Sequence, residues 1–340
     1  VLATGLAPGN YYFEETAAPE GFLLNTEKVF FTIVSSEEGA PEAVDAGLLQ
    51  NYKGSAVLRK TAEDGIGLKD AEFALYSEEG LKLRENLMTD EEGFLRLKDL
   101  SPGSYWLEET KAPEGYIRNT DRISFEIPME AEGEPLVLTL DEFINWQGSV
   151  LLQKSDERGN PLEGAVFALR KDNETIKELT TDALGQILVE GLTPGGYEFL
   201  EISAPTGFIL DPTIHEFRIS EDAAGEPERI LVGTLKNHQG KMEFEKTDEK
   251  GTPLVGAVFE LRDQEGNLIR KELVSDEDGK VKAEGLFPGS YVLKETHAPA
   301  GYIRNEQTLE FTVTEEHYGA PDVLDLGQFV NYRGSLLLKK

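Results

Sequence analysis

The chain repeats itself at the period of a whole domain. The phrase LAPGNYYFEETAAPEGF at residues 6–22 recurs as LSPGSYWLEETKAPEGY (100–116), LTPGGYEFLEISAPTGF (192–208) and LFPGSYVLKETHAPAGY (286–302). A second phrase, an asparagine followed three residues later by a glycine, occurs four times, and its glycines lie 94, 92 and 94 residues apart. This period is too long for a solenoid unit, so the fold must be one that about 90 residues can complete.

The register of the copies predicts the domain limits. We expect three complete repeats, at 54–147, 148–239 and 240–333. Residues 1–53 match only the second half of a repeat, and residues 334–340 match only the opening strand of another. We therefore interpret the chain as a fragment of a longer array, and we expect a signal peptide and an anchor outside it.

The pattern within each repeat predicts an all-β fold. Apolar residues occur in short alternating runs, and turns such as DEKG, DQEG and DEDG separate them. No stretch keeps the apolar spacing of a helix. In the third repeat we expect seven strands, near 241–247, 256–262, 268–274, 279–284, 290–296, 307–313 and 325–332. This number of short strands predicts tandem Greek-key β-sandwich domains.

Composition excludes several classes of partner. The net charge of −31 disfavours binding to nucleic acid and to anionic lipid, because like charges repel. The sequence has no run of about 18 apolar residues, so we expect no membrane contact in this segment. It also has no cysteine, so any covalent staple must come from chemistry other than a disulfide.

The sequence does not predict an enzyme that acts on external substrates. It contains no phosphate-binding loop, dinucleotide fingerprint or recognisable Ser-His-Asp arrangement. The four histidines (His215, His238, His297 and His317) fall at unequal positions of the repeats and form no ligand pattern. We therefore expect no metal and no cofactor.

One lysine in each repeat lies on the wrong face of its strand. In KMEFEK (241–246) side chains alternate between two faces, so Met242, Phe244 and Lys246 share the apolar one. Lys60 and Lys154 have the same position in the other repeats. An isolated charge is strongly disfavoured in an apolar interior, so these lysines require an explanation.

Each repeat also directs a glutamate and an asparagine inward. The glutamate follows the lysine by 49, 47 and 49 residues, and the asparagine follows the glutamate by 36 residues in every copy. The lysine lies on the first strand and the asparagine on the last, and these strands can lie side by side in a Greek-key sandwich. We therefore expect three clusters: Lys60, Glu109 and Asn145; Lys154, Glu201 and Asn237; Lys246, Glu295 and Asn331.

Such a cluster predicts a specific reaction. Burial lowers the pKa of a lysine and raises that of a glutamic acid. A neutral amine is a nucleophile, and a protonated glutamic acid can polarise the asparagine carbonyl and pass a proton to the departing ammonia. The product is an intramolecular isopeptide bond, favoured by the high effective concentration of held groups. The alternatives are a lysine that extends its head to water and an ordinary buried salt bridge.

These motifs resemble a known family. YVLKETHAPAGY, with KTDEKGTPLVGAVFEL before it and FVNYRG after it, is similar to the Cna protein B-type domain, the SpaA-like repeat of Gram-positive pilins and surface adhesins. The resemblance covers essentially the whole chain. It implies a prealbumin-like, immunoglobulin-like sandwich. One departure is EISAP at 201–205, where the other copies have threonine after the glutamate.

The resemblance implies that each lysine is joined to its asparagine and that the glutamate promotes the bond. The pairs are Lys60–Asn145 with Glu109, Lys154–Asn237 with Glu201, and Lys246–Asn331 with Glu295. Glu15, Asn51 and Lys340 occupy matching positions but lack a complete set of partners in this chain. The reaction is a single-turnover self-modification, so we do not class the protein as an enzyme.

We expect a structural stalk in an extracellular, cell-wall-associated protein, in which neighbouring repeats of the same chain are the partners. One alternative is that the repeats bind a host extracellular-matrix protein or glycan. For that role Trp106 and Trp146, which we expect to be exposed, are candidate contacts. The other alternative is a segment of a polymerising pilin shaft, although neither a pilin motif nor a sorting signal is visible.

Overall fold

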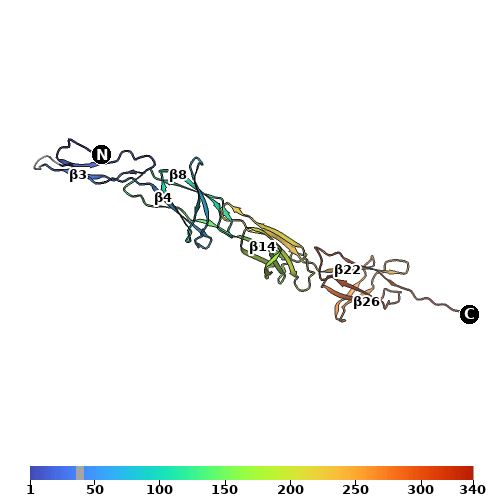
Figure 1. Cartoon of the computed structure of the whole chain (residues 1–340). Helices are drawn as coiled ribbons and strands as arrows, with labels where there is room; N and C mark the ends of the chain where they lie inside the picture. Colours follow the sequence, from blue (N-terminus) through green and yellow to red (C-terminus); the bar gives the residue numbers. More distant parts are fainter. Residues whose placement is uncertain (36–41, 340) are drawn as a thin grey trace. The chain divides into compact units, whose positions relative to one another are not determined.

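The computed structural model describes residues 1–35 and 42–339, and all regular structure in these ranges is β-strand (Figure 1). The all-β prediction is therefore confirmed. The residues divide into two compact units. The first runs to Gly148 and includes residues 191–195 and 220–228; the second contains 149–190, 196–219 and the residues from Arg229 onward. Among the described residues, no helix has the length and apolar character needed to cross a membrane.

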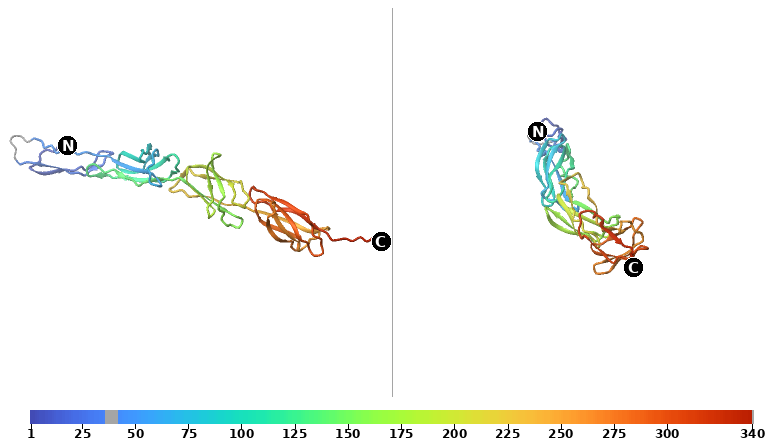
Figure 2. Two further views of the ribbon diagram at one scale, coloured as in Figure 1. Left: turned by 90° about the horizontal axis from the view of Figure 1, so that it is seen from below. Right: turned by 90° about the vertical axis from the view of Figure 1, so that its right-hand side faces the viewer.

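The third repeat shows the sandwich most completely. Its seven strands lie within two residues of the predicted ranges: β22 (Gly240–Asp248), β23 (Val258–Asp263), β24 (Leu268–Val274), β25 (Lys280–Leu286), β26 (Gly289–His297), β27 (Thr308–Val313) and β28 (Leu324–Asn331). They form a three-stranded sheet in the order β25-β22-β28 and a four-stranded sheet in the order β24-β23-β26-β27. In both views of Figure 2 these strands, drawn in orange and red, gather into one domain.

The first complete repeat has the same two layers. Its main strands are β4 (Gly54–Ala62), β5 (Glu72–Ser77), β6 (Lys82–Met88), β7 (Phe94–Leu100), β8 (Gly103–Lys111), β10 (Arg122–Ile127), β12 (Leu138–Thr139) and β13 (Phe143–Asn145). Two further strands have two residues each: β9 (Arg118–Asn119) and β11 (Glu130–Ala131). One sheet has the order β10-β8-β5-β6, and in the other β4 pairs with β7, β12 and β13.

The second repeat follows the same order. Its strands are β14 (Gly148–Ser155), β15 (Val166–Lys171), β16 (Glu174–Thr180), β17 (Gln186–Leu192), β18 (Gly195–Ser203), β19 (Ile214–Ile219), β20 (Asp222–Ala223) and β21 (Ile230–Lys236). The sheets have the orders β17-β14-β21 and β16-β15-β18-β19.

The last strand of each repeat is parallel to the first, and a register shift interrupts this pairing. In the second and third repeats a glycine with positive φ, Gly233 (101°) or Gly327 (76°), lies at the shift and keeps the strand continuous. The first repeat has Asp141 at this position, and its last strand is split into β12 and β13. A side chain resists the left-handed conformation that glycine adopts freely, which explains the difference.

The two end segments form less structure. Residues 1–35 contain β1 (Gly9–Phe13), which is antiparallel to β3 (Val29–Ile33), and the short β2 (Leu24–Asn25). Residues 334–339 form no strand, whereas the sequence predicts an opening strand there. A strand needs a hydrogen-bonded neighbour, and within the described residues this segment has none. Lys340 lies outside the described residues.

The repeated glycine of the asparagine-glycine phrase has a packing role. A Cβ added to Gly54 would lie 2.3 Å from a methyl carbon of Ile127, and one added to Gly240 would lie 2.6 Å from methyl carbons of Val313. The first strand of each of these repeats therefore begins in close contact with the facing sheet. This contact fixes the strand that carries the inward lysine.

Candidate functional site

The lysine and the asparagine of the first repeat lie on adjacent parallel strands. In the register of β4 and β13, Lys60 is opposite Phe143, and Ala62 is opposite Asn145. Alternate residues share a face, so Lys60 and Asn145 are diagonal neighbours on the core side of the sheet. Both residues are fully buried, with 0% exposure. The Lys60 Nζ donates to the Phe143 carbonyl at 2.9 Å.

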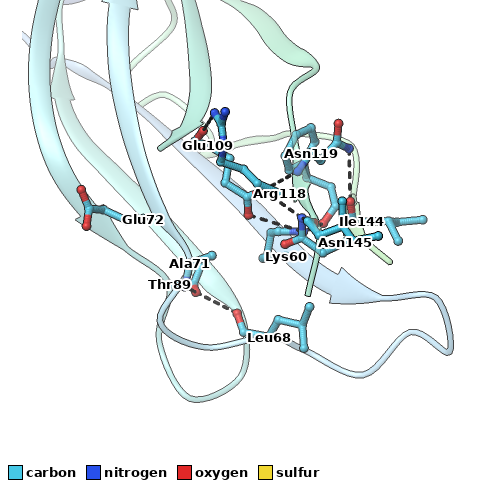
Figure 3. Close-up of polar contacts among 12 residues, drawn as sticks. Lys60, Leu68, Ala71, Glu72, Thr89, Glu109, Arg118, Asn119, Ile144 and Asn145 are labelled. Atoms are coloured by element: carbon cyan, nitrogen blue, oxygen red, sulfur yellow. Dashed lines mark hydrogen bonds and ion pairs between the residues drawn. The ribbon is translucent and has the colours of Figure 1, made fainter. Parts of the chain in front are cut away.

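The glutamate reaches the same point from the facing sheet. Glu109 lies on β8 and is also 0% exposed. Its Oε2 accepts a hydrogen bond from the Asn145 Nδ2 at 2.8 Å, and its Oε1 lies 3.9 Å from the Lys60 Nζ. Figure 3 shows the three side chains converging between the two layers. The structure therefore brings together the residues that the sequence pattern selects in this repeat.

The second repeat repeats this arrangement. The Asn237 Nδ2 donates to the Glu201 Oε2 at 2.9 Å. The Lys154 Nζ lies 3.2 Å from the Glu201 Oε1. Threonine is absent after this glutamate, and the buried cluster forms without it.

The third repeat differs slightly in how the lysine is held. The Asn331 Nδ2 donates to the Glu295 Oε2 at 3.0 Å. The Lys246 Nζ donates to the main-chain carbonyls of Phe329, at 2.9 Å, and Thr247, at 3.2 Å. Lys246 of the KMEFEK strand is 0% exposed, so its head does not extend to water.

The partial repeat at the start of the chain contains two members of the cluster. The Asn51 Nδ2 donates to the Glu15 Oε2 at 2.8 Å. In the complete repeats the lysine precedes its glutamate by 47 or 49 residues, so no residue of this chain holds the lysine position that belongs with Glu15 and Asn51. Glu15 and Asn51 therefore form the glutamate–asparagine pair without a lysine in the described part of the chain.

The clusters contain acceptors that lack donors. Within the described residues, the buried Oδ1 atoms of Asn145, Asn237 and Asn331 have no hydrogen-bond partner, and neither do the Oε1 atoms of Glu109 and Glu295. A buried unsatisfied acceptor is costly and calls for an explanation. A single proton on the glutamate would supply the missing donor, as in a neutral carboxylic acid.

Burial shifts the charge states in the direction that such chemistry needs. Removal from water lowers the pKa of Lys60 to about 7, against the opposing attraction of Glu109, and lowers that of Lys246 to about 8. Burial also lowers the pKa of Lys154. It raises the pKa of Glu109 and of Glu201, in each case against the charge of the neighbouring lysine. Near neutral pH a substantial fraction of Lys60 is therefore an uncharged amine.

The structure adds four residues that the sequence analysis did not select. Each of these bridging residues donates its main-chain N–H to the Oε2 of the glutamate ten residues earlier, at 2.8, 2.8, 3.0 and 2.7 Å in chain order. The bridging residues are Asn25, Asn119, Asp211 and Asn305. The constant spacing of ten residues is the sequence signal that could have found them.

The two tryptophans are less accessible than predicted. Trp106 is half-buried, because neighbouring side chains cover both faces of its indole ring. The ring stacks on Tyr76, with 3.9 Å between the ring centroids, and the Cζ of the Arg122 guanidinium lies 4.0 Å from the ring centroid. Trp146 is also half-buried, and its backbone pairs with Ile117. The expectation that both are exposed is therefore wrong.

Comparison with known proteins finds one family model that matches most of the chain. The family model described as SpaA, prealbumin-like fold domain, matches residues 1–46, 54–140, 148–228 and 240–323. Serine-aspartate repeat-containing protein D of Staphylococcus aureus (strain Newman) is 23% identical over 255 residues, which cover 63% of this chain and 19% of that protein. The chain thus spans about a fifth of the length of the curated relatives it matches.

Solved structures are similar over most of the chain. The TIE protein of Bacillus anthracis is 28% identical, with a TM-score of 0.43, over 83% of this chain and 52% of that chain. BcpA, the major pilin subunit of Bacillus cereus, is 17% identical, with a TM-score of 0.33, over 83% of this chain and 99% of that chain.

The lowered lysine pKa predicts how stability depends on pH in a chain that cannot crosslink. In Asn145→Ala, Lys60 keeps its amine, whose pKa of about 7 in the folded state lies below the ordinary 10.5. Between these values the unfolded state binds more protons, so the free energy of unfolding of the first repeat rises with pH, by up to about 1.4 kcal/mol per unit. Denaturant unfolding from about pH 7 to about pH 9 measures this slope.

The control for this experiment is Lys60→Met in the same Asn145→Ala background, which should remove the rise. The raised pKa of Glu109 has the opposite sign: its contribution to stability is present at low pH and is lost as pH rises through the folded-state value. If the free energy of unfolding rises equally with pH with and without Lys60, the rise cannot be assigned to the lowered pKa of Lys60.

Proposed function

The chain belongs to the SpaA family of prealbumin-like fold domains, and on this premise we propose that it is a structural stalk of a bacterial cell-surface protein. In this proposal each complete repeat closes its own Lys–Asn isopeptide bond, promoted by the buried glutamate. The observation that carries it is the same buried trio of lysine, glutamate and asparagine in three successive repeats. An ordinary buried ion pair would not require an inward asparagine hydrogen-bonded to the glutamate each time.

The proposed reaction balances within the cluster. The neutral Lys60 Nζ attacks the Asn145 Cγ, and a new C–N bond forms. The Cγ–Nδ2 bond breaks, and Nδ2 leaves as ammonia. Glu109 starts protonated, gives its proton to the leaving nitrogen and takes one from Nζ, so it ends as it began. No external reactant is required, because the fold supplies the proximity.

The positions of the bonds suit a chain under tension. Each bond would join residues 83 to 85 positions apart, and only eight residues lie between Asn145 and Lys154 or between Asn237 and Lys246. A pulling force would then pass through one crosslink, along the eight residues between them, and into the next. Most of each repeat would carry almost no load.

The proposed crosslinks also fit a location outside the cell. An extracellular protein is exposed to proteases and mechanical force, and domains without cysteine cannot be stabilised by disulfides. We place the chain in an extracellular, cell-wall-associated protein, with neighbouring repeats as its partners. A host matrix protein or glycan remains the alternative partner, and a pilin shaft the alternative setting.

Removing a glutamate should abolish one crosslink and spare the others. In Glu109→Ala the bond between Lys60 and Asn145 should fall to a small fraction of its normal yield, because the proton shuttle is gone. Proteolysis and mass spectrometry of the crosslinked peptides measure each bond separately.

The matched control for Glu109→Ala is Glu108→Ala. Glu108 directly precedes Glu109 and points to the opposite face of β8, so its replacement should leave all three bonds intact. Glu201→Ala and Glu295→Ala should move the loss to the second and third repeats. Full crosslinking in Glu109→Ala would contradict the proposed role of the glutamate.

The stalk function predicts a mechanical result. Pulled by its ends, the unaltered chain should not release the loops closed by the crosslinks. Lys60→Ala should add one unfolding step that frees 85 residues, or roughly 300 Å of extended chain. Single-molecule force spectroscopy measures the step. Lys69→Ala, an exposed lysine of the same repeat, should add none; a long step in the unaltered chain would contradict the proposed load path.

A further inference from the structure

Three of the four bridging residues do more than hold the glutamates, because Asn25, Asn119 and Asp211 lie where the following repeat contacts the preceding one. In the first unit β9 pairs in parallel with β20 of the following repeat, and β2 pairs in the same way with β11. In the second unit Leu210 forms the equivalent parallel bridge with Glu316. We call the segments that make these contacts the docking loops: residues 129–135, 221–227 and 315–321.

Each docking loop contacts the bridging side chain through a glycine. The Gly133 N–H donates to the Asn25 Oδ1 at 3.1 Å, and the Gly225 N–H donates to the Asn119 Oδ1 at 3.3 Å. The Gly319 N–H donates to the carboxylate of Asp211. These glycines have φ of 69°, 66° and 70°, a left-handed conformation that other residues adopt only with strain.

In the first repeat the bridging residue connects three parts of the molecule. The main-chain N–H of Asn119 donates to Glu109, and its Nδ2 donates to the carbonyl of Ile144, the residue before Asn145. Its Oδ1 accepts from the docking loop. Figure 3 shows Asn119 between Glu109 and Ile144. One side chain therefore links the glutamate, the strand of the reacting asparagine and the next repeat.

A second contact reinforces this link. The Arg118 guanidinium forms a two-point ion pair with Asp222 of the docking loop, at 2.8 and 3.0 Å. The same guanidinium donates to the main-chain carbonyl of Glu109 at 3.1 Å. Two-point pairs of this kind fix geometry as well as adding energy. The docking loop thus restrains both the backbone of Glu109 and the N–H that holds its carboxyl group.

The third repeat provides an internal comparison. Asn305 donates its N–H to Glu295 and its Nδ2 to the carbonyl of Val330, as its counterpart in the first repeat does. Within the described part of the chain no docking loop pairs with Arg304 or Asn305, and Arg304 pairs with Glu306 instead. The glutamate site is therefore formed here without a following repeat.

We propose that the docking loop is a positioning element for the crosslink of the preceding repeat, so that this bond forms at its full rate only after the next repeat has folded and docked. The proposal rests on the proposed crosslinking function. Its physical basis is that a short edge strand held on one side only moves more than one held on both. Without the docking loop, the Asn119 N–H moves more and orients the Glu109 carboxyl group less well toward the side-chain amide of Asn145.

The decisive test places the substitution in one repeat and reads the effect in another. Gly225→Val puts a β-branched residue at the left-handed position and displaces the docking loop from Asn119. The chain is made by cell-free synthesis and quenched at intervals, and the crosslinked peptides are quantified by mass spectrometry.

We expect the Lys60–Asn145 bond to form about tenfold more slowly, the change that loss of one positioning hydrogen bond gives. The bonds of the second and third repeats should form at their normal rates, although the substitution lies in the second. Ordinary destabilisation would instead slow the bond of the repeat that carries the substitution.

Matched variants separate docking from strain. Gly159→Val imposes the same left-handed conformation, φ 86°, in the second repeat but away from the docking loop, and should leave the first crosslink unchanged. Asn119→Ala removes the acceptor from the other side of the contact and should slow the same bond as Gly225→Val. Gly319→Val should shift the slowing to the Lys154–Asn237 bond.

Two results would overturn the proposal: slowing confined to the second repeat in Gly225→Val, or slowing in no repeat. A chain in which no repeat loses ammonia would overturn the proposed function instead. Hydrogen exchange of the Asn119 N–H then tests the docking effect without crosslinking. Faster exchange in Gly225→Val would support control by the docking loop, and unchanged exchange would exclude it.

Discussion

The parallel pairing of the first and last strands is the constraint on which the rest of each repeat depends. It places the lysine and the asparagine two residues out of register on one face, close enough for their side chains to meet. The facing sheet then needs only one inward glutamate to complete the cluster. The fold thereby brings together residues that lie 83 to 85 positions apart in the sequence.

Burial sets the protonation states of the side chains in this arrangement. In water the same lysine would be an ammonium and the same glutamic acid a carboxylate, and neither could take part in amide exchange. Inside the sandwich, loss of hydration lowers the lysine pKa and raises that of the carboxyl group in the first repeat. The hydrophobic core therefore stabilises the domain and also sets the charge states of the groups within it.

Strand alternation, a local property, allowed much of this site to be predicted from sequence. Lys246 follows two apolar residues on one face of KMEFEK, and that pattern is visible without any tertiary contact. The exposure of Trp106 could not be predicted, because Tyr76 and Arg122 cover it from other strands. The split at Asp141 depends on backbone strain, and the missing strand at 334–339 depends on an absent neighbour. Asn119 was missed because its partners include the next repeat.

The intact mass of the purified, unaltered chain tests the central claim most directly. Each isopeptide bond releases one ammonia, about 17 Da, so crosslinking in all three complete repeats predicts a deficit of about 51 Da from the sequence mass. A deficit of one or two ammonias would show that in one or two repeats the cluster forms without reacting. A mass equal to that of the sequence would contradict the account and leave Lys60 and Lys154 as partners of ordinary buried salt bridges, and Lys246 as a buried lysine held by main-chain carbonyls.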